Sequence, residues 1–237
     1  MGLCPIFFIF IFLYFYNNLT VKLLYPNKVN DNIKIEEGDP MKTMIWAHRG
    51  ASAYAPENTM EAFRLAKKMG ADGLELDVHL TKDGHMVVAH DETVDRCSDG
   101  KGRIVDKTLD ELLKLDFSKC FDNYSDIRIP TLQEVLEFAK ASGLTVNIEI
   151  KSGIVLYEKI EEKICDLVSK MDMKDRVIYS SFNHYSLMLV RKLEPSAKIG
   201  ILYSEAMIDP CIYAGHIRAD AIHPYYLTLM VPGAVEG

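Results

Sequence analysis

Polar and charged residues, three of them acidic, occupy alternate positions in two segments that have the composition of β-strands. Glu75 and Asp77 lie two residues apart in GLELDVHL, and Glu149 lies in the later segment TVNIEIK. Residues two apart on a strand point to the same face of a sheet. Carboxylates gathered on one buried face repel one another unless a cation neutralises them, and oxygen ligands suit a hard divalent ion. The pattern predicts that these three acids bind one Mg²⁺ or Ca²⁺; the alternative is that they are rim charges paired with lysine or arginine.

Two histidines follow short apolar segments. His48 comes after MIWA, and His90 comes after MVVA. Two imidazoles beside an acidic cluster can move protons in both directions. Arg49 offers a planar guanidinium for a phosphate or a carboxylate, and Lys151 adds a second positive charge. An acid–base pair, two cations and a metal ion together favour phosphodiester cleavage, because the cations stabilise the charge on the phosphoryl group during the reaction.

The residues that carry this chemistry lie on or next to strands that alternate with helices. Seven strands are expected, at Met44–Ala47, Gly73–Leu80, Met86–His90, Thr145–Lys151, Val177–Phe182, Lys198–Tyr203 and Ala221–Tyr225. Such alternation predicts an α/β protein with a parallel sheet covered by helices. Polar residues at the strand ends, and the lack of a G-x-G-x-x-G motif after the first strand, favour a TIM-type (β/α)8 barrel. With seven strands counted, the barrel is expected to be truncated before the eighth strand.

Three expected helices begin with a capping residue and a glutamate three residues later. The pairs are Asn58 with Glu61, Thr108 with Glu111, and Thr131 with Glu134. In such a pair, both side chains accept hydrogen bonds from backbone amides that have no partner within the helix. Gly70 and Gly143 follow the first and third of these helices, as is typical of a left-handed helix end.

The bulk composition limits the function classes. The chain has 237 residues and a formal net charge of −7, so it lacks the basic surface that a general nucleic-acid-binding protein needs. Its five cysteines are scattered without C-x-x-C spacing, which argues against a zinc site or a disulfide framework. The sequence does not indicate an oligomeric state.

The first part of the chain differs from the rest. Residues 3–16 form an apolar run that is short for a membrane span and closer to the core of a signal peptide. Two interpretations stay open. A signal or anchor would make the protein membrane-anchored or secreted, whereas translation from Met41 would make it cytoplasmic. We expect a hydrophobic segment and a linker over residues 1–40, and the barrel over residues 41–237.

Four motifs, in order along the chain, resemble those of the glycerophosphodiester phosphodiesterase family. They are AHRG with PENT, ELDVHLTKDGHMVVAHD, IPTLQEVLEF and NIEIK. The resemblance implies a β/α barrel that hydrolyses glycerophosphodiesters to glycerol 3-phosphate and an alcohol with a divalent metal. The implied roles are acid–base catalysis for His48 and His90, metal binding for Glu75, Asp77 and Glu149, and phosphate binding for Arg49 and Lys151. Residues 92–129 are similar to the small insertion that shapes the glycerol side of the family's pocket.

Further residues are weaker candidates. His223 ends the seventh expected strand, where it could touch the substrate, and Glu57 could brace the loop after His48. His79 shares the face of the strand acids but lies further along, so we expect it to line the pocket or its rim. Asp91 could orient an imidazole.

Two other functions stay open. The first is a lipid phosphodiesterase of the lysophospholipase D kind, with membrane association through residues 3–16. The second is an inactive truncated barrel that only binds phosphate or metal, because the Trp-Thr-like segment usual in the family's last strand has no match here.

Overall fold

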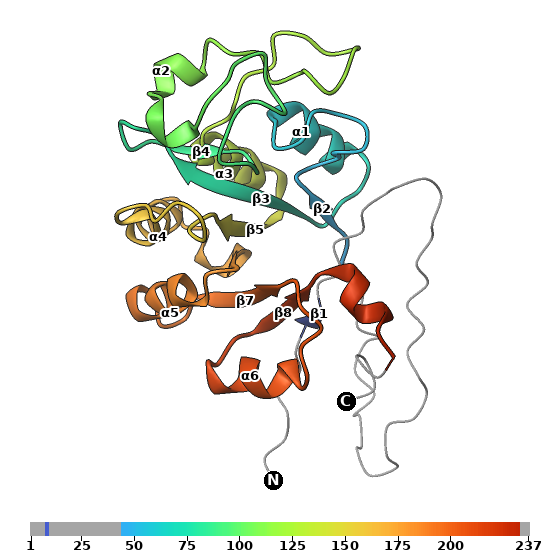
Figure 1. Cartoon of the computed structure of the whole chain (residues 1–237), viewed down its shortest axis with the longest axis vertical. Helices are drawn as coiled ribbons and strands as arrows, with labels where there is room; N and C mark the ends of the chain where they lie inside the picture. Colours follow the sequence, from blue (N-terminus) through green and yellow to red (C-terminus); the bar gives the residue numbers. More distant parts are fainter. Residues whose placement is uncertain (1–7, 10–43, 233–237) are drawn as a thin grey trace.

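The structure is a computed structural model that describes residues 8–9 and 44–232. Figure 1 shows a curved sheet with α4, α5 and α6 along one side. The strands are β1 (Phe8–Ile9), β2 (Trp46–His48), β3 (Gly73–Leu80), β4 (Met86–Val88), β5 (Thr145–Ile150), β6 (Val177–Ser181), β7 (Lys198–Tyr203) and β8 (Ala221–Pro224). The α-helices are α1 (Met60–Lys68), α2 (Leu109–Leu112), α3 (Leu132–Ser142), α4 (Ile160–Lys170), α5 (His184–Leu193) and α6 (Pro210–His216). Short 3-10 helices lie at Ile104–Asp106, Lys174–Arg176 and Tyr226–Met230.

The strands form one sheet, in the order β1-β8-β7-β6-β5-β3-β2, with β4 attached to β3. All neighbours along this order run parallel. Within the described residues, β2 pairs only with β3 and β1 only with β8, so the sheet is a curled half-barrel with open edges. The predicted β/α-barrel architecture, incomplete in its strands, is confirmed for this part of the chain.

The segment Met86–His90 was expected to be a barrel strand, and this expectation is wrong. β4 pairs antiparallel with β3 in a hairpin, with Val78 opposite Val88. The turn at Gly84 is too short for the crossover of about a dozen residues that joins parallel strands. The barrel part of the sheet therefore contains β2, β3, β5, β6, β7 and β8, one strand fewer than expected.

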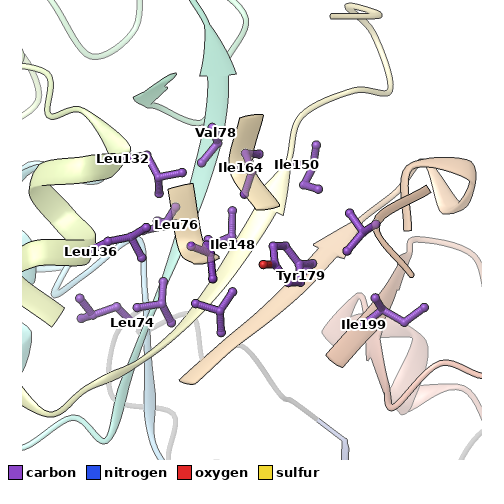
Figure 2. Packing of buried hydrophobic residues seen from close by; sticks show 14 of the residues in the cluster. Leu74, Leu76, Val78, Leu132, Leu136, Ile148, Ile150, Ile164, Tyr179 and Ile199 are labelled. Atoms are coloured by element: carbon purple, nitrogen blue, oxygen red, sulfur yellow. The ribbon is translucent and has the colours of Figure 1, made fainter. Parts of the chain in front are cut away.

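Alternate residues of the central strands separate an apolar face from a polar one. Leu74 and Leu76 of β3 are fully buried and lie in one cluster with Leu136 of α3 (Figure 2). Burying a side chain of this size stabilises the fold by about 1.5–3 kcal/mol. Glu75 and Asp77 alternate with these leucines and point to the opposite, inner face of the half-barrel.

The predicted helix starts are confirmed at two positions and wrong at one. Thr108 and Thr131 each form a reciprocal capping box, and Gly143 ends α3 in the left-handed conformation. Helix α1 is capped by Thr59 and not by Asn58. The backbone of Asn58 is left-handed (φ 57°). Its side chain donates a hydrogen bond to Asp77 of β3, so it is not available as a cap.

The insertion between β4 and α3 has a small core of its own. Its buried residues are Val87, Val94, Ile104, Leu112, Phe117, Ile127 and Ile129. Most of the N-terminal segment predicted over residues 1–40, including most of the apolar run, lies outside the described residues. In the part of the chain that the structure describes, no helix has the length and apolar character needed to cross a membrane.

Candidate active site

Three buried carboxylates converge at the inner face of β3 and β5. Asp77 lies opposite Glu149, and Glu75 lies opposite Asn147, in the parallel ladder between these strands. One oxygen from each of Glu75, Asp77 and Glu149 lies within 4.8 Å of the others. The structure therefore brings together the three acids that the alternating pattern singled out.

Burial and mutual repulsion separate the pKa values of these acids. Burial, with the neighbouring Asp77 charge, raises the pKa of Glu75 well above its usual range. The same two causes raise the pKa of Glu149 to about 7. Burial also acts to raise the pKa of Asp77, but the positive charges of Arg49 and Lys151 outweigh it and lower that pKa to about 2.

Two cationic side chains lie against the carboxylates. The Nζ of Lys151 lies 2.9 Å from Glu149 Oε1 and 3.6 Å from Asp77 Oδ1. The Nε of Arg49 lies 3.5 Å from Asp77 Oδ2, and its backbone N–H donates a 3.0 Å hydrogen bond to Glu75 Oε2. The alternative of acids paired with lysine and arginine therefore holds for part of the cluster.

The cluster also fits a hard divalent cation. All three donors are oxygens, the ligand type that Mg²⁺ and Ca²⁺ prefer. Among the described residues, Oδ1 of Asp77 is buried and accepts no hydrogen bond. Asn58 Nδ2 donates a 2.8 Å hydrogen bond to the other oxygen, Oδ2, which fixes the carboxylate plane. Arg49 and Lys151 do not neutralise the cluster, because they are two cations beside three carboxylates and Arg49 also contacts a further carboxylate, Glu57.

His48 lies beside this cluster at the end of β2. Its Nε2 is 3.9 Å from Glu75 Oε2. Burial, together with the charge of Arg49, lowers the pKa of His48 to about 4. The imidazole is therefore neutral at pH 7 and able to accept a proton.

His90 reaches the site from the loop after β4 and not from the end of a barrel strand, so its expected equivalence with His48 is wrong. Its Nδ1 lies 2.6 Å from Asp91 Oδ1, which orients the ring and leaves Nε2 for other partners. Asp91 thus has the geometry to orient an imidazole, as the sequence suggested.

His79 was expected to line the pocket or its rim, and its full burial contradicts a place at the rim. Its Nε2 lies 3.2 Å from the backbone oxygen of His90, and its Nδ1 lies 2.8 Å from the hydroxyl of Tyr157. Burial lowers the pKa of His79 to about 4. A neutral ring satisfies both contacts if Nε2 donates to the carbonyl and Nδ1 accepts from the hydroxyl. The β4 hairpin covers the end of β3 that carries His79. The alternating pattern of β3 by itself does not show that another strand covers that end.

The two weaker candidates have different surroundings. Glu57 accepts a 3.1 Å hydrogen bond from Arg49, so it does brace the loop after His48. His223 is buried on β8, where burial lowers its pKa to about 3. Strands β5, β6 and β7 separate it from the acids of β3 in the sheet, so the structure does not group it with them.

Two residues that were not predicted as site residues also contact the site. Asn58 was predicted as a helix cap, yet its side chain binds Asp77. Arg96 forms ion pairs with Glu57 and Asp91. Arg96 lies in an irregular segment without periodicity, so no pattern in the sequence indicates the position of its side chain.

Comparisons with known proteins agree with this architecture. The model of the glycerophosphoryl diester phosphodiesterase family matches residues 48–226. The chain is 51% identical over 198 residues to a glycerophosphodiester phosphodiesterase of Caldanaerobacter subterraneus subsp. tengcongensis, covering 83% of this chain and 81% of that protein. The crystal structure of a glycerophosphodiester phosphodiesterase from Agrobacterium tumefaciens is 30% identical, with a TM-score of 0.69 and coverage of 82% and 81%.

An Oleispira antarctica phosphodiesterase, solved in complex with the product sn-glycerol-3-phosphate, is 31% identical, with a TM-score of 0.67 and coverage of 77% of this chain and 74% of that chain. The family match and these relatives agree with the parallel half-barrel. The chain therefore belongs to the glycerophosphoryl diester phosphodiesterase family and is an enzyme of that class.

Proposed function

We propose that this enzyme hydrolyses small glycerophosphodiesters to glycerol 3-phosphate and an alcohol in a reaction that depends on a divalent metal ion. The observation that carries the proposal is the convergence of three buried carboxylates with Arg49, Lys151 and His48 on one face of the sheet. A relative that is 51% identical over 198 residues is named for the same activity.

Glu75, Asp77 and Glu149 would hold one Mg²⁺ or Ca²⁺. When bound, the ion supplies positive charge that stabilises the charge on the phosphoryl oxygens in the transition state. Arg49 and Lys151 bind further phosphate oxygens. Both stay cationic at neutral pH, and the carboxylates beside Lys151 raise the pKa of its ammonium above the usual value, against the effect of burial.

His48 and His90 are the proposed acid–base pair. One histidine removes the proton of the substrate's glycerol 2-hydroxyl as that oxygen bonds to phosphorus. The other donates its proton to the oxygen of the departing alcohol as the bond from phosphorus to that oxygen breaks. Water then opens the resulting cyclic phosphate, with the proton transfers reversed, and glycerol 3-phosphate forms.

The test measures glycerol 3-phosphate release from glycerophosphocholine, with and without a chelator. We expect release that the chelator abolishes and that added Mg²⁺ or Ca²⁺ restores. His48→Ala and His90→Ala are assayed separately, and each is expected to lower kcat by about a hundredfold or more, as is usual for a lost general acid or base. Near-full activity of either variant rules out the paired role. No release at any metal concentration favours the alternative of a barrel that only binds metal or phosphate.

Lysophospholipids are a second candidate substrate class. Two large apolar side chains, Ile154 and Leu156, lie in the loop after Lys151 and are 78% and 81% exposed. Exposed apolar residues beside a phosphate-binding lysine suit an acyl chain next to the scissile phosphodiester. A comparison of kcat/KM for lysophosphatidylcholine and glycerophosphocholine tests this. Ile154→Ser with Leu156→Ser lowers only the first value if the loop binds the acyl chain.

A further inference from the structure

The guanidinium of Arg96 contacts two carboxylates at once. Its NH1 and NH2 each donate a 2.8 Å hydrogen bond to Glu57, one to each oxygen. Its Nε donates a 2.7 Å hydrogen bond to Oδ2 of Asp91, and NH2 also donates to Oδ1 at 3.0 Å. Both carboxylates are therefore held in a bidentate manner by one planar group.

Each of these carboxylates has a second partner in the candidate active site. Asp91 Oδ1 lies 2.6 Å from Nδ1 of His90. Glu57 Oε1 accepts a 3.1 Å hydrogen bond from NH1 of Arg49. Arg96 thus connects two proposed functional groups: the acid–base residue His90 through Asp91, and the phosphate-binding residue Arg49 through Glu57.

The backbone around Arg96 is fixed by the core of the insertion. Val94 is buried in that core at 1% exposure, and Ser98 closes a turn by donating a 2.9 Å hydrogen bond from its N–H to the oxygen of Val94. The thiol of Cys120 lies 3.4 Å from the backbone oxygen of Arg96. The insertion therefore places the guanidinium, and the guanidinium places the two carboxylates.

Stability alone does not account for this arrangement. The side chains of Arg96, Glu57 and Asp91 are 43%, 19% and 29% exposed. A single ion pair with this degree of exposure contributes little to the free energy of unfolding, and a bidentate arginine within a network of charges contributes somewhat more. Geometry is more sensitive, because a small misplacement of a reacting group lowers the rate far more than it lowers stability.

We propose that Arg96 is a positioning residue that fixes His90 through Asp91 and Arg49 through Glu57. This inference rests on the proposed function, in which His90 transfers a proton and Arg49 binds phosphate. Arg96 itself does not touch the substrate. The insertion thereby sets the geometry of the acid–base and phosphate-binding groups, in addition to forming a wall of the pocket.

The test compares Arg96→Ala and Arg96→Lys with Arg128→Ala, a change to an exposed arginine of the same insertion outside this network. We expect Arg96→Ala to lower kcat/KM at least about tenfold while the midpoint of thermal unfolding falls by only a few degrees. Arg96→Lys recovers only part of the loss, because an ammonium cannot hold two carboxylates in a bidentate manner. Arg128→Ala stays within about twofold of wild type.

A second comparison tests the route of the effect. In a chain that already carries Glu57→Ala and Asp91→Ala, adding Arg96→Ala is expected to change kcat/KM by less than about twofold, since both connections are already broken. A tenfold further loss overturns the inference. Wild-type kcat/KM in Arg96→Lys or in Arg96→Ala also overturns it. If Arg96→Ala does not fold, Arg96→Lys replaces it in every comparison.

A readout without catalysis separates this inference from the proposed function. If wild type with metal releases no glycerol 3-phosphate, the proposed function fails. The nitrogen NMR signals of the His90 ring in the full chain still report its hydrogen bond to Asp91. A change of these signals in Arg96→Ala, but not in Arg128→Ala, supports the positioning role. Unchanged His90 signals contradict it.

Discussion

Replacing Glu149 by glutamine is expected to make the metal-free protein more stable at high pH and not at low pH. The pKa of Glu149 is raised from 4.5 to about 7, first by burial and then by the charge of Asp77. The folded state therefore holds a proton on Glu149 at pH values where the unfolded state has released it. The free energy of unfolding consequently falls as pH rises from about 4.5 to about 7.

The full pKa difference corresponds to about 3 kcal/mol, at about 1.4 kcal/mol per pH unit. Between about pH 5 and about pH 8, we expect the stability of Glu149→Gln relative to wild type to increase by about 2–3 kcal/mol. Subtracting the free energy of unfolding of wild type from that of Glu149→Gln removes the contributions that both chains share from His48, His79 and His223. Their lowered pKa values have the opposite effect: stability is lost as pH falls below about 6.5.

The measurement is urea unfolding of both chains in the presence of a chelator at the two pH values. Glu158→Gln is the matched control, because the side chain of Glu158 is 88% exposed. Added Mg²⁺ or Ca²⁺ at the higher pH is expected to stabilise wild type and to have little effect on Glu149→Gln. A difference between wild type and Glu149→Gln that does not vary with pH refutes the argument that burial and charge repulsion act on this carboxyl.

Two further substitutions test a support of the site at Asn58 and the packing of β7 against β8 at Gly200. Asn58→Ala loses the hydrogen bond to Asp77 and places alanine at φ 57°, so urea unfolding should show that the free energy of unfolding falls by about 2–4 kcal/mol. Asn58→Gly can keep the left-handed backbone conformation, so it should lose only the contribution of the hydrogen bond. Equal losses in both would contradict the contribution of the left-handed backbone. Gly200→Ala places a methyl group 2.6 Å from the ring of His223, so we expect the free energy of unfolding to fall by about 1–3 kcal/mol. Gly153→Ala is the control, because no atom lies within 4 Å of its added carbon and little steric strain is expected. Equal stability of these two alanine variants would show that β8 moves away without cost.

The sequence was most informative where local rules decide the structure. The period of two along a strand placed Glu75 and Asp77 on one face, and the ladder between β3 and β5 then brought Glu149 opposite Asp77. The capping pairs at Thr108 and Thr131 depend on residues three apart and needed no tertiary information.

Strand direction was less predictable from composition. The apolar run of β4 has the same composition as a barrel strand, and only the short turn at Gly84 distinguishes a hairpin from a crossover. Because Met86–His90 was counted as a parallel barrel strand, His90 was also expected at the end of such a strand. The hairpin covers His79, so this residue, expected to line the pocket or its rim, is fully buried.

Tertiary contacts from irregular segments were not predictable. Arg96 contacts Asp91 from an insertion and Tyr157 contacts His79 from a loop, and in neither segment does a periodic pattern show which way a side chain points. Asn58 illustrates a competition between two roles. Its type and spacing suit a helix cap, but a buried carboxylate opposite it offers a stronger, charge-assisted hydrogen bond, and Thr59 takes over the cap.

The charge balance of the site links metal binding to substrate binding. Without metal, burial and the Asp77 charge raise the pKa of Glu75 well above its usual range, whereas Arg49 and Lys151 lower the pKa of Asp77. In the proposed function, a bound divalent ion would add positive charge beside these acids and would lower the pKa of Glu75. A phosphodiester carries one negative charge, so the ion would add to the attraction that Arg49 and Lys151 are proposed to exert on it. The same two cations would therefore serve both ligands, because they lower the pKa of the proposed metal ligand Asp77 and are the proposed phosphate contacts.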